Sequence, residues 1–325
     1  KRSGSWLAAK STCGRSERRP VALGRQRRAG RYPPPMATPD SLVRTLSADH
    51  GVSVRALSAT NLVREAARRH ATSPTATVAL GRALMGTLLL ASETQDGERV
   101  QLRIRGDGPI GTILVTASSA GDVRGYAAHP AVQLPPDGDR FDVGGAVGGG
   151  TLAVERNHPS WKQPYSGIVP LVSGEIALDL AHYLLESEQK PSAVALGVQL
   201  GPDGEVAAAG GYLVQALPEA SPDALDVIER RVGALREPSV LLRAGSSADG
   251  LLDRLVGGLG SDAVARIEPG FACPCDERRV PAALALLGAD ELRQIVEDRE
   301  TVEVRCAFCT EPYRIAPESV ARLLA

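Results

Sequence analysis

The chain lacks any run of about 18 or more apolar residues, and this absence argues against a membrane span. Aromatic residues are scarce, at 3% of the sequence, although 43% of the residues are hydrophobic. A sizeable core is therefore expected, built mainly from Ala, Val, Leu and Ile. No repeat of about 20–50 residues is visible, so a solenoid or propeller is not expected.

Recognisable catalytic groupings are missing as well. The five histidines are scattered, and none stands at the spacing of a metal-ligand pair; they are His50, His70, His129, His158 and His182. No arrangement of nucleophile and base can be identified. The sequence therefore predicts a protein that is not an enzyme.

Two glycine-rich segments resemble nucleotide-binding loops without meeting their requirements. Residues 106–111 match the pattern GxGxxG, but TILVTAS follows and indicates a strand where the dinucleotide fingerprint needs a helix. We expect a hairpin turn there. The segment 144–150, GGAVGGG, lacks the Lys-Ser/Thr of a phosphate loop and is expected to be a mobile loop.

Charge is unevenly distributed along the chain, although the net charge is only −1. Residues 1–35 carry ten Lys or Arg and one acid, which leaves 27 basic and 37 acidic residues for the remainder. A body this acidic is a poor match for a phosphate backbone, so no nucleic-acid partner is expected.

The basic leader, residues 1–35, allows three interpretations. It has the Arg-rich, acid-poor composition of an organelle transit peptide, and also that of a nucleic-acid-binding arm. We favour the third, a disordered and non-native leader ahead of a start at Met36. It has no continuous apolar stretch of the kind found in secretory signals, so we expect a cytoplasmic protein.

The rest of the chain divides into three parts by pattern. Residues 36–218 mix alternating strand patterns with apolar helical ones, which indicates an α+β core domain of sheets and helices. Residues 219–268 carry a helical apolar stripe and the helix-weakening glycines 257, 258 and 260. We expect a helical linker of modest stability that docks its apolar side on a neighbour. Residues 269–325 form a small cysteine-bearing domain.

Several elements can be placed within the core domain. A helix over 75–91, apolar on most sides, should be buried, and residues 193–217 should form a hairpin around GPDG. Asn61 is the expected N-cap of an amphipathic helix. Ser173 is the expected cap of a later helix, whose apolar face comprises Ile176, Leu180, Ala181 and Leu184.

The strongest signal is a pair of cysteine doublets near the C-terminus. Cys273-Pro-Cys275 is followed, after thirty residues, by Cys306-Ala-Phe-Cys309. Two close pairs of thiolates match the tetrahedral ligand set of zinc. Disulfide scaffolding does not fit a long chain whose few cysteines cluster at one end. We expect one Zn²⁺ ion, with Phe308 and Tyr313 beside it, a helix over 281–287 and another over 290–296, and a strand leading to Cys306.

Two alternatives remain for this zinc site: a purely structural site and a redox switch. The single spacer in Cys273-Pro-Cys275 is unusual for a structural site. Thiolates are also the form that peroxide attacks, and oxidation to disulfides would remove the ligands. Zinc contributes roughly 10–16 kcal/mol to small domains, so its loss would unfold this one.

Several longer sequence motifs between Met36 and Ala325 resemble those of a known protein family. The chain resembles the redox-regulated 33-kDa heat-shock chaperone family (33-kDa chaperonins) in the order and spacing of its motifs. These are RGDGPIGTILVTA, QPYSGIVPLVSGEIALDLAHYLLESEQ, GYLVQALP and the CxC…CxxC pair. Asp276 and Arg278 depart from the family pattern after the second cysteine, which leaves the four ligands intact but bears on oxidant sensitivity.

The resemblance implies a mechanism. It implies a zinc-bound form that is inactive when reduced, and disulfides Cys273–Cys275 and Cys306–Cys309 when oxidised. The linker then unfolds, and the protein holds unfolded or partially folded clients without ATP during oxidative stress. A monomer is implied for the reduced form and a homodimer for the oxidised form.

Two other functions compete with this one. A static zinc-ribbon protein with a regulatory or nucleic-acid-binding role would need a basic, aromatic-lined face, but residues 271–325 mix acids and bases. A metabolic enzyme with an appended zinc module would need the catalytic grouping that the sequence lacks.

Overall fold

The computed structural model describes residues 6–8, 39–136, 138, 140–235, 237–276, 284, 288–298 and 301–322. Two compact units make up the chain: Pro39–Cys273 is one, and Pro274–Ala325 with Lys1–Thr38 is the other. The helix predicted over 281–287 lies outside the described residues, apart from Leu284, as does the leader apart from residues 6–8.

The first unit contains a five-stranded antiparallel sheet. Its order is β11-β2-β3-β10-β9. The strands are β2 (Ser41–Leu46), β3 (Val52–Ser58), β9 (Ser192–Leu200), β10 (Val206–Ala216) and β11 (Ala265–Ile267). The hairpin predicted around GPDG is confirmed as β9 and β10.

A six-stranded sheet completes the first unit, in the order β12-β6-β5-β4-β7-β8. Its strands are β4 (Arg99–Gly106), β5 (Thr112–Ser118), β6 (Asp122–Ala127), β7 (Gly150–Asn157), β8 (Tyr165–Pro170) and β12 (Gly270–Phe271). Only β12 pairs in parallel with its neighbour. The GxGxxG segment is confirmed as the turn between β4 and β5.

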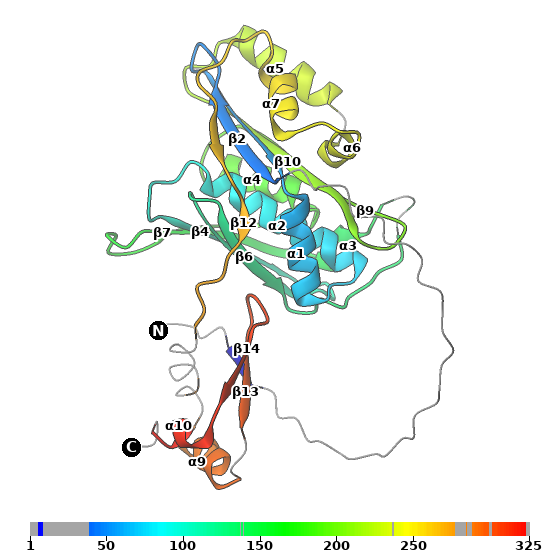
Figure 1. The fold of residues 1–325 in the computed structure, drawn as a ribbon. Helices are drawn as coiled ribbons and strands as arrows, with labels where there is room; N and C mark the ends of the chain where they lie inside the picture. The colour runs from blue at the N-terminus through cyan, green and yellow to red at the C-terminus, as the bar shows by residue number, and fades with distance from the viewer. Residues whose placement is uncertain are drawn as a thin grey trace. The chain divides into compact units, whose positions relative to one another are not determined.

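Helix α2 (Pro74–Ala91) lies between the two sheets and contacts strands of both (Figure 1). Its sequence is apolar nearly throughout, so most of its residues are buried, as predicted. By length and composition it could cross a membrane, but 89% of that window is buried inside the protein. It is the centre of the main core, which confirms the α+β class.

Three further helices flank this core, and two of them begin differently from prediction. They are α1 (Thr60–His70), α3 (Val143–Val147) and α4 (Ala177–Glu186). Asn61 does not cap α1. Instead, the carboxylate of Asp40, about twenty residues earlier in the chain, accepts hydrogen bonds from the first N–H groups of the helix, those of Asn61 at 3.1 Å and Leu62 at 2.7 Å.

Ser173 does not cap α4 either. The buried carboxylate of Asp179 accepts from the N–H groups of Val172, Ser173 and Ile176 at 2.8–2.9 Å, and Ser173 Oγ donates to it. The predicted apolar face is confirmed by burial of Ile176, Leu180 and Leu184. A third expectation was wrong in part: residues 143–147, which overlap the glycine-rich segment 144–150, form helix α3, which Asp142 caps through the Gly145 N–H.

The predicted linker forms three helices: α5 (Pro222–Ala234), α6 (Pro238–Arg243) and α7 (Ala248–Val256). They pack on the face of the five-stranded sheet that points away from α2. Val43, Val54 and Tyr212 on the sheet share a second core there with Leu251 and Leu255 of α7. The prediction that the linker docks its apolar side on a neighbour is confirmed.

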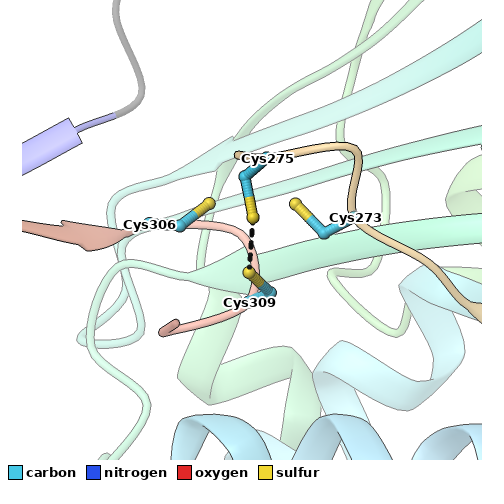
Figure 2. A group of neighbouring side chains, drawn as sticks. All are labelled: Cys273, Cys275, Cys306 and Cys309. Atoms are coloured by element: carbon cyan, nitrogen blue, oxygen red, sulfur yellow. Dashed lines mark hydrogen bonds between the residues drawn. The ribbon is translucent and has the colours of Figure 1, made fainter. Parts of the chain in front are cut away.

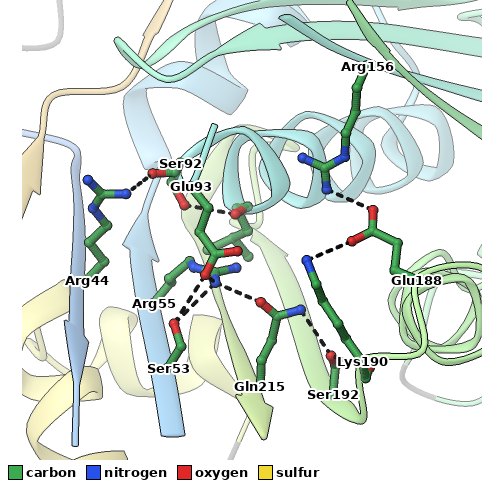
Figure 3. A network of polar contacts seen from close by, with 11 residues as sticks. Arg44, Ser53, Arg55, Ser92, Glu93, Arg156, Glu188, Lys190, Ser192 and Gln215 are labelled. Carbon is green, nitrogen blue, oxygen red and sulfur yellow. Dashed lines mark hydrogen bonds and ion pairs between the residues drawn. The ribbon is translucent and has the colours of Figure 1, made fainter. Parts of the chain in front are cut away.

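A polar network joins residues of β2, β3 and β10 to the residues that follow α2 (Figure 3). Arg55, which is 1% exposed, pairs with Glu93 and donates to Gln215 Oε1 at 2.7 Å. Burial lowers the pKa of Arg55 to about 9, and the positive charges of Arg44 and Arg156 add to this. These bonds all engage the Nη2 atom of Arg55 and offset part of the cost of burying this cation.

The second unit is small. Strands β1 (Trp6–Ala8), β13 (Val302–Cys306) and β14 (Pro312–Ile315) form an antiparallel sheet in the order β1-β13-β14, with helices α9 (Ala289–Glu297) and α10 (Pro317–Ala321). The predicted helix over 290–296 and the strand leading to Cys306 are confirmed. The core of this unit comprises Leu284, Leu292, Val304, Ile315 and Val320.

Candidate metal centre

The two cysteine doublets reach one place from different kinds of local structure. Cys273 and Cys275 lie just after β12, in a segment without regular secondary structure. Cys306 is the last residue of β13, and Cys309 lies in the turn that follows. That turn is closed by the Thr310 N–H, which donates to the Cys306 carbonyl at 2.8 Å, and by the Cys306 N–H, which donates to Glu311. The hairpin therefore presents both sulfurs of the second doublet on one side.

The four sulfur atoms converge (Figure 2). All lie within 4.8 Å of one another, and the Sγ atoms of Cys275 and Cys309 are 3.3 Å apart. None of the four is joined in a disulfide. A zinc ion with bonds of about 2.3 Å separates its tetrahedral ligands by about 3.8 Å. The donor set and its spacing fit a tetrahedral metal site.

Burial differs between the doublets. Cys306 and Cys309 are each 3% exposed, whereas Cys273 and Cys275 are half-buried. The first doublet is therefore the more accessible to solvent.

Two polar side chains contact the sulfurs. The Tyr313 hydroxyl donates to Cys275 Sγ at 3.2 Å, and Arg124 Nη1 of β6 donates to Cys273 Sγ at 3.3 Å. The bond to Cys275, together with burial and nearby thiolate charge, raises the pKa of Tyr313 above its ordinary value. The placement of Tyr313 beside the site was predicted from the sequence. Arg124 was not, because it lies 149 residues from its partner.

Comparison with known proteins places these features in context. A model of the family described as "Hsp33 protein" matches residues 40–316. The 33 kDa chaperonin of Geobacter sulfurreducens is 43% identical over 285 residues, which cover 87% of this chain and 94% of that protein. The 33 kDa chaperonin of Symbiobacterium thermophilum is 45% identical over 287 residues, which cover 87% and 97% respectively.

The fold has a solved counterpart. The crystal structure of the 33 kDa chaperonin (heat shock protein 33 homolog) from Thermotoga maritima superposes with a TM-score of 0.82 at 36% identity. The match covers 88% of this chain and 98% of that one. The resemblance that the sequence motifs carried is therefore confirmed in both sequence and fold.

Proposed function

The chain belongs to the Hsp33 protein family, and on that premise we propose that it is a redox-regulated chaperone that works without ATP. It holds unfolded or partially folded client proteins and keeps them from irreversible aggregation during oxidative stress. The observation that carries the proposal is the convergence of four cysteine sulfurs within 4.8 Å. Such a set can exist as metal ligands or as disulfides, but not as both.

In the reduced form, Cys273, Cys275, Cys306 and Cys309 hold one Zn²⁺ ion. When bound, the ion keeps all four sulfurs as thiolates and ties the two doublets together. Tyr313 and Arg124 orient the two half-buried sulfurs by donating hydrogen bonds to them. The second unit has a core of only a few side chains, so it depends on these ties for its stability.

Oxidation converts each doublet into a disulfide. One thiolate attacks an oxygen of hydrogen peroxide, forms a sulfenic acid and expels hydroxide. The neighbouring thiolate attacks that sulfur, forms the S–S bond and expels a second hydroxide. Each doublet loses two electrons, and each peroxide is reduced to two hydroxide ions. We propose the bonds Cys273–Cys275 and Cys306–Cys309 from the family resemblance, since the 4.8 Å spacing permits cross-pairing as well.

The response to oxidation is exposure of an apolar face. Helices α5–α7 cover the outer side of the five-stranded sheet, where Val43, Val54 and Tyr212 lie. Without the metal centre after it, this linker loses its fold and uncovers the sheet. Exposed apolar surface of this extent binds unfolded chains with little sequence preference.

Further parts of the proposal concern the protein's surroundings. We propose that it acts in the cytoplasm, as a monomer when reduced and as a homodimer when oxidised. The acidic body, with 37 acidic and 27 basic residues after the leader, supports solubility of a chain that exposes apolar surface. It also disfavours a nucleic-acid partner.

One experiment tests the proposal directly. The purified, zinc-loaded protein is treated with peroxide or hypochlorite while released zinc is followed with a chromogenic chelator. Light scattering then measures aggregation of a heat-denatured client in the presence of each form. We expect zinc release and strong suppression of aggregation only after oxidation. Equal suppression by both forms, or zinc that stays bound, would show that the site is a static zinc ribbon.

A further inference from the structure

One edge of the six-stranded sheet is occupied by a short piece of the chain itself. We call residues 267–272 the strap. Its strand β12 pairs in parallel with β6 (Figure 1). The Gly270 N–H donates to the Gly121 carbonyl at 3.0 Å, and the Ala272 N–H donates to the Val123 carbonyl at 2.9 Å. These are backbone bonds, so they do not require particular side chains in the strap.

An aromatic side chain of the strap fits against the end of helix α1. Phe271 is half-buried and packs on the main core. The Arg69 guanidinium lies 5.2 Å from the centre of its ring, and the buried His70 ring meets it edge-on at 6.4 Å. This position accepts a flat apolar group with a cation over its face.

A glycine just before β6 allows the backbone of the strap to approach this sheet edge closely. Gly121 has φ of +95°, and a Cβ at this position would lie 2.6 Å from the Glu268 carbonyl oxygen. A larger residue would hold the strap away from β6. Beyond the Phe271 position, Arg124 donates to Cys273 Sγ. The metal ligand Cys273 thus directly follows the strap.

We propose that this edge of β6, with the Phe271 position beside α1, is a binding site for extended client segments that carry an aromatic residue. The strap is its built-in occupant in the reduced protein. This inference rests on the proposed function and assigns a location to part of its client binding. The occupant's chemistry follows from the strap: an extended backbone adds to the sheet edge, and an aromatic ring fills the place under Arg69.

Redox control then follows from chain connectivity. Cys273 lies two residues after Phe271, so loss of its place in the metal centre frees the C-terminal end of the strap. The strap is held to β6 by few bonds, and an edge strand of two residues has little stability of its own. A client segment replaces it with the same kind of bonds.

A peptide with the sequence of residues 265–272, ARIEPGFA, serves as the probe. It is labelled with fluorescein, and its binding to the full-length protein is followed by anisotropy. We expect the oxidised protein to bind it at least tenfold more tightly than the reduced, zinc-loaded protein. A peptide with Phe271→Ser should bind the oxidised protein several-fold more weakly.

Matched variants locate the site. In the oxidised protein, Arg69→Ala should weaken peptide binding about three- to tenfold, the range expected for a lost cation–π contact. Arg68→Ala is the control, because Arg68 pairs with the same Glu65 as Arg69 but is exposed. A photo-reactive benzoylphenylalanine at the Phe position should cross-link to β6 or to the last turn of α1.

The outcomes separate this inference from the proposed function. Oxidised protein that suppresses client aggregation but does not bind the peptide, or that cross-links only at β8 or under α5–α7, overturns the inference and leaves the function standing. Equal effects of Arg68→Ala and Arg69→Ala also overturn it. Oxidised protein that fails to suppress aggregation refutes the proposed function, whatever the peptide does.

Discussion

The carboxylate of Asp179 is fully buried beneath the first turn of α4. Burial alone would raise its pKa, but hydrogen bonds from the N–H groups of Ser173, Val172 and Ile176 and from the Ser173 hydroxyl outweigh burial. The pKa of Asp179 therefore lies below its ordinary value of 3.8. A carboxyl with a lowered pKa stabilises the fold above its ordinary pKa, and this contribution is lost as the pH falls through the folded-state pKa.

Replacement of this carboxylate should lower stability and flatten its acid dependence. We expect Asp179→Asn to reduce the free energy of unfolding by about 1–3 kcal/mol at neutral pH, because the amide accepts fewer of the four bonds. Below about pH 4 the difference from the wild type should shrink. Urea unfolding at several pH values measures this, with Asp203→Asn in the exposed turn after β9 as the control. An undiminished difference at low pH would contradict the assignment.

Single cysteines should matter unequally. Cys306→Ser removes one of the four sulfurs, so we expect zinc content after purification to fall well below that of the wild type, and the second unit to unfold at lower temperature. Elemental analysis and thermal unfolding check this. Cys13→Ser, outside the doublets, should leave the zinc content unchanged. Equal zinc in both variants would argue against a four-thiolate site.

Residue-level prediction succeeded where partners are close in sequence. The cysteine doublets could be identified because each pair lies within a few residues, and Tyr313 follows the second doublet closely. Asp40 at the start of α1 and Arg124 at Cys273 could not be identified, because each acts on a group brought near only by the fold. Asn61 and Ser173 were plausible caps by type, but a nearby carboxylate accepts the N–H groups more strongly.

At the scale of elements, helix α6 packs closely on strand β9 of the sheet. A Cβ at Gly197 of β9 would lie 2.5 Å from Ser239 Oγ and 2.9 Å from Ser239 Cβ, both in α6. Ser239 is fully buried at this contact. The absence of a side chain at Gly197 thus permits the linker to pack down.

The same substitution at two glycines should have opposite effects. Gly197→Ala should loosen α6 and raise chaperone activity of the reduced protein several-fold, because the added methyl group displaces Ser239. Gly233→Ala in α5 meets nothing within 4 Å and should stabilise that helix by up to about 1 kcal/mol. Client light scattering without oxidant and binding of an apolar dye measure both. Activation by Gly233→Ala, or none by Gly197→Ala, would refute this account of docking.

Element prediction depended on length and periodicity. The long apolar pattern of α2 and the alternation in β4 each repeat enough times to be recognised. Strands β11 and β12 have three and two residues, too few for any period to show. Helix α3 was hidden by its glycines, whose low helix propensity is overcome by the Asp142 cap and by burial of Val143 and Val147.

At the scale of the whole molecule, stability should be uneven. The main core joins both sheets to α2, whereas the second unit has a core of few side chains. After oxidation and zinc removal, we expect fast amide exchange over residues 219–268 and in the second unit, with β4, β5 and β7 still protected. Hydrogen exchange with mass spectrometry checks this. Uniform loss of protection would indicate global unfolding instead of a switch.

The fold class and the division into sheets and helices could be predicted from the sequence, but the order of strands could not. Neighbours such as β3 and β10, or β4 and β7, pair across long stretches of chain. The residue pattern within one strand does not identify the distant strand with which it pairs. The placement of α5–α7 on one face of a sheet was foreseen only as docking on an unnamed neighbour.

Both ends of the linker connect to strands of the five-stranded sheet. Its N-terminal end follows β10, which lies between β3 and β9, and its C-terminal end forms the edge strand β11 beside β2. The segment of three helices is therefore attached to the same sheet at both of its ends. The departing strand has eleven residues and the returning strand only three, bonded on one side. Detachment of the linker should begin at β11, where it has the fewest backbone bonds. The topology therefore predicts that the linker opens from its C-terminal end toward its N-terminal end.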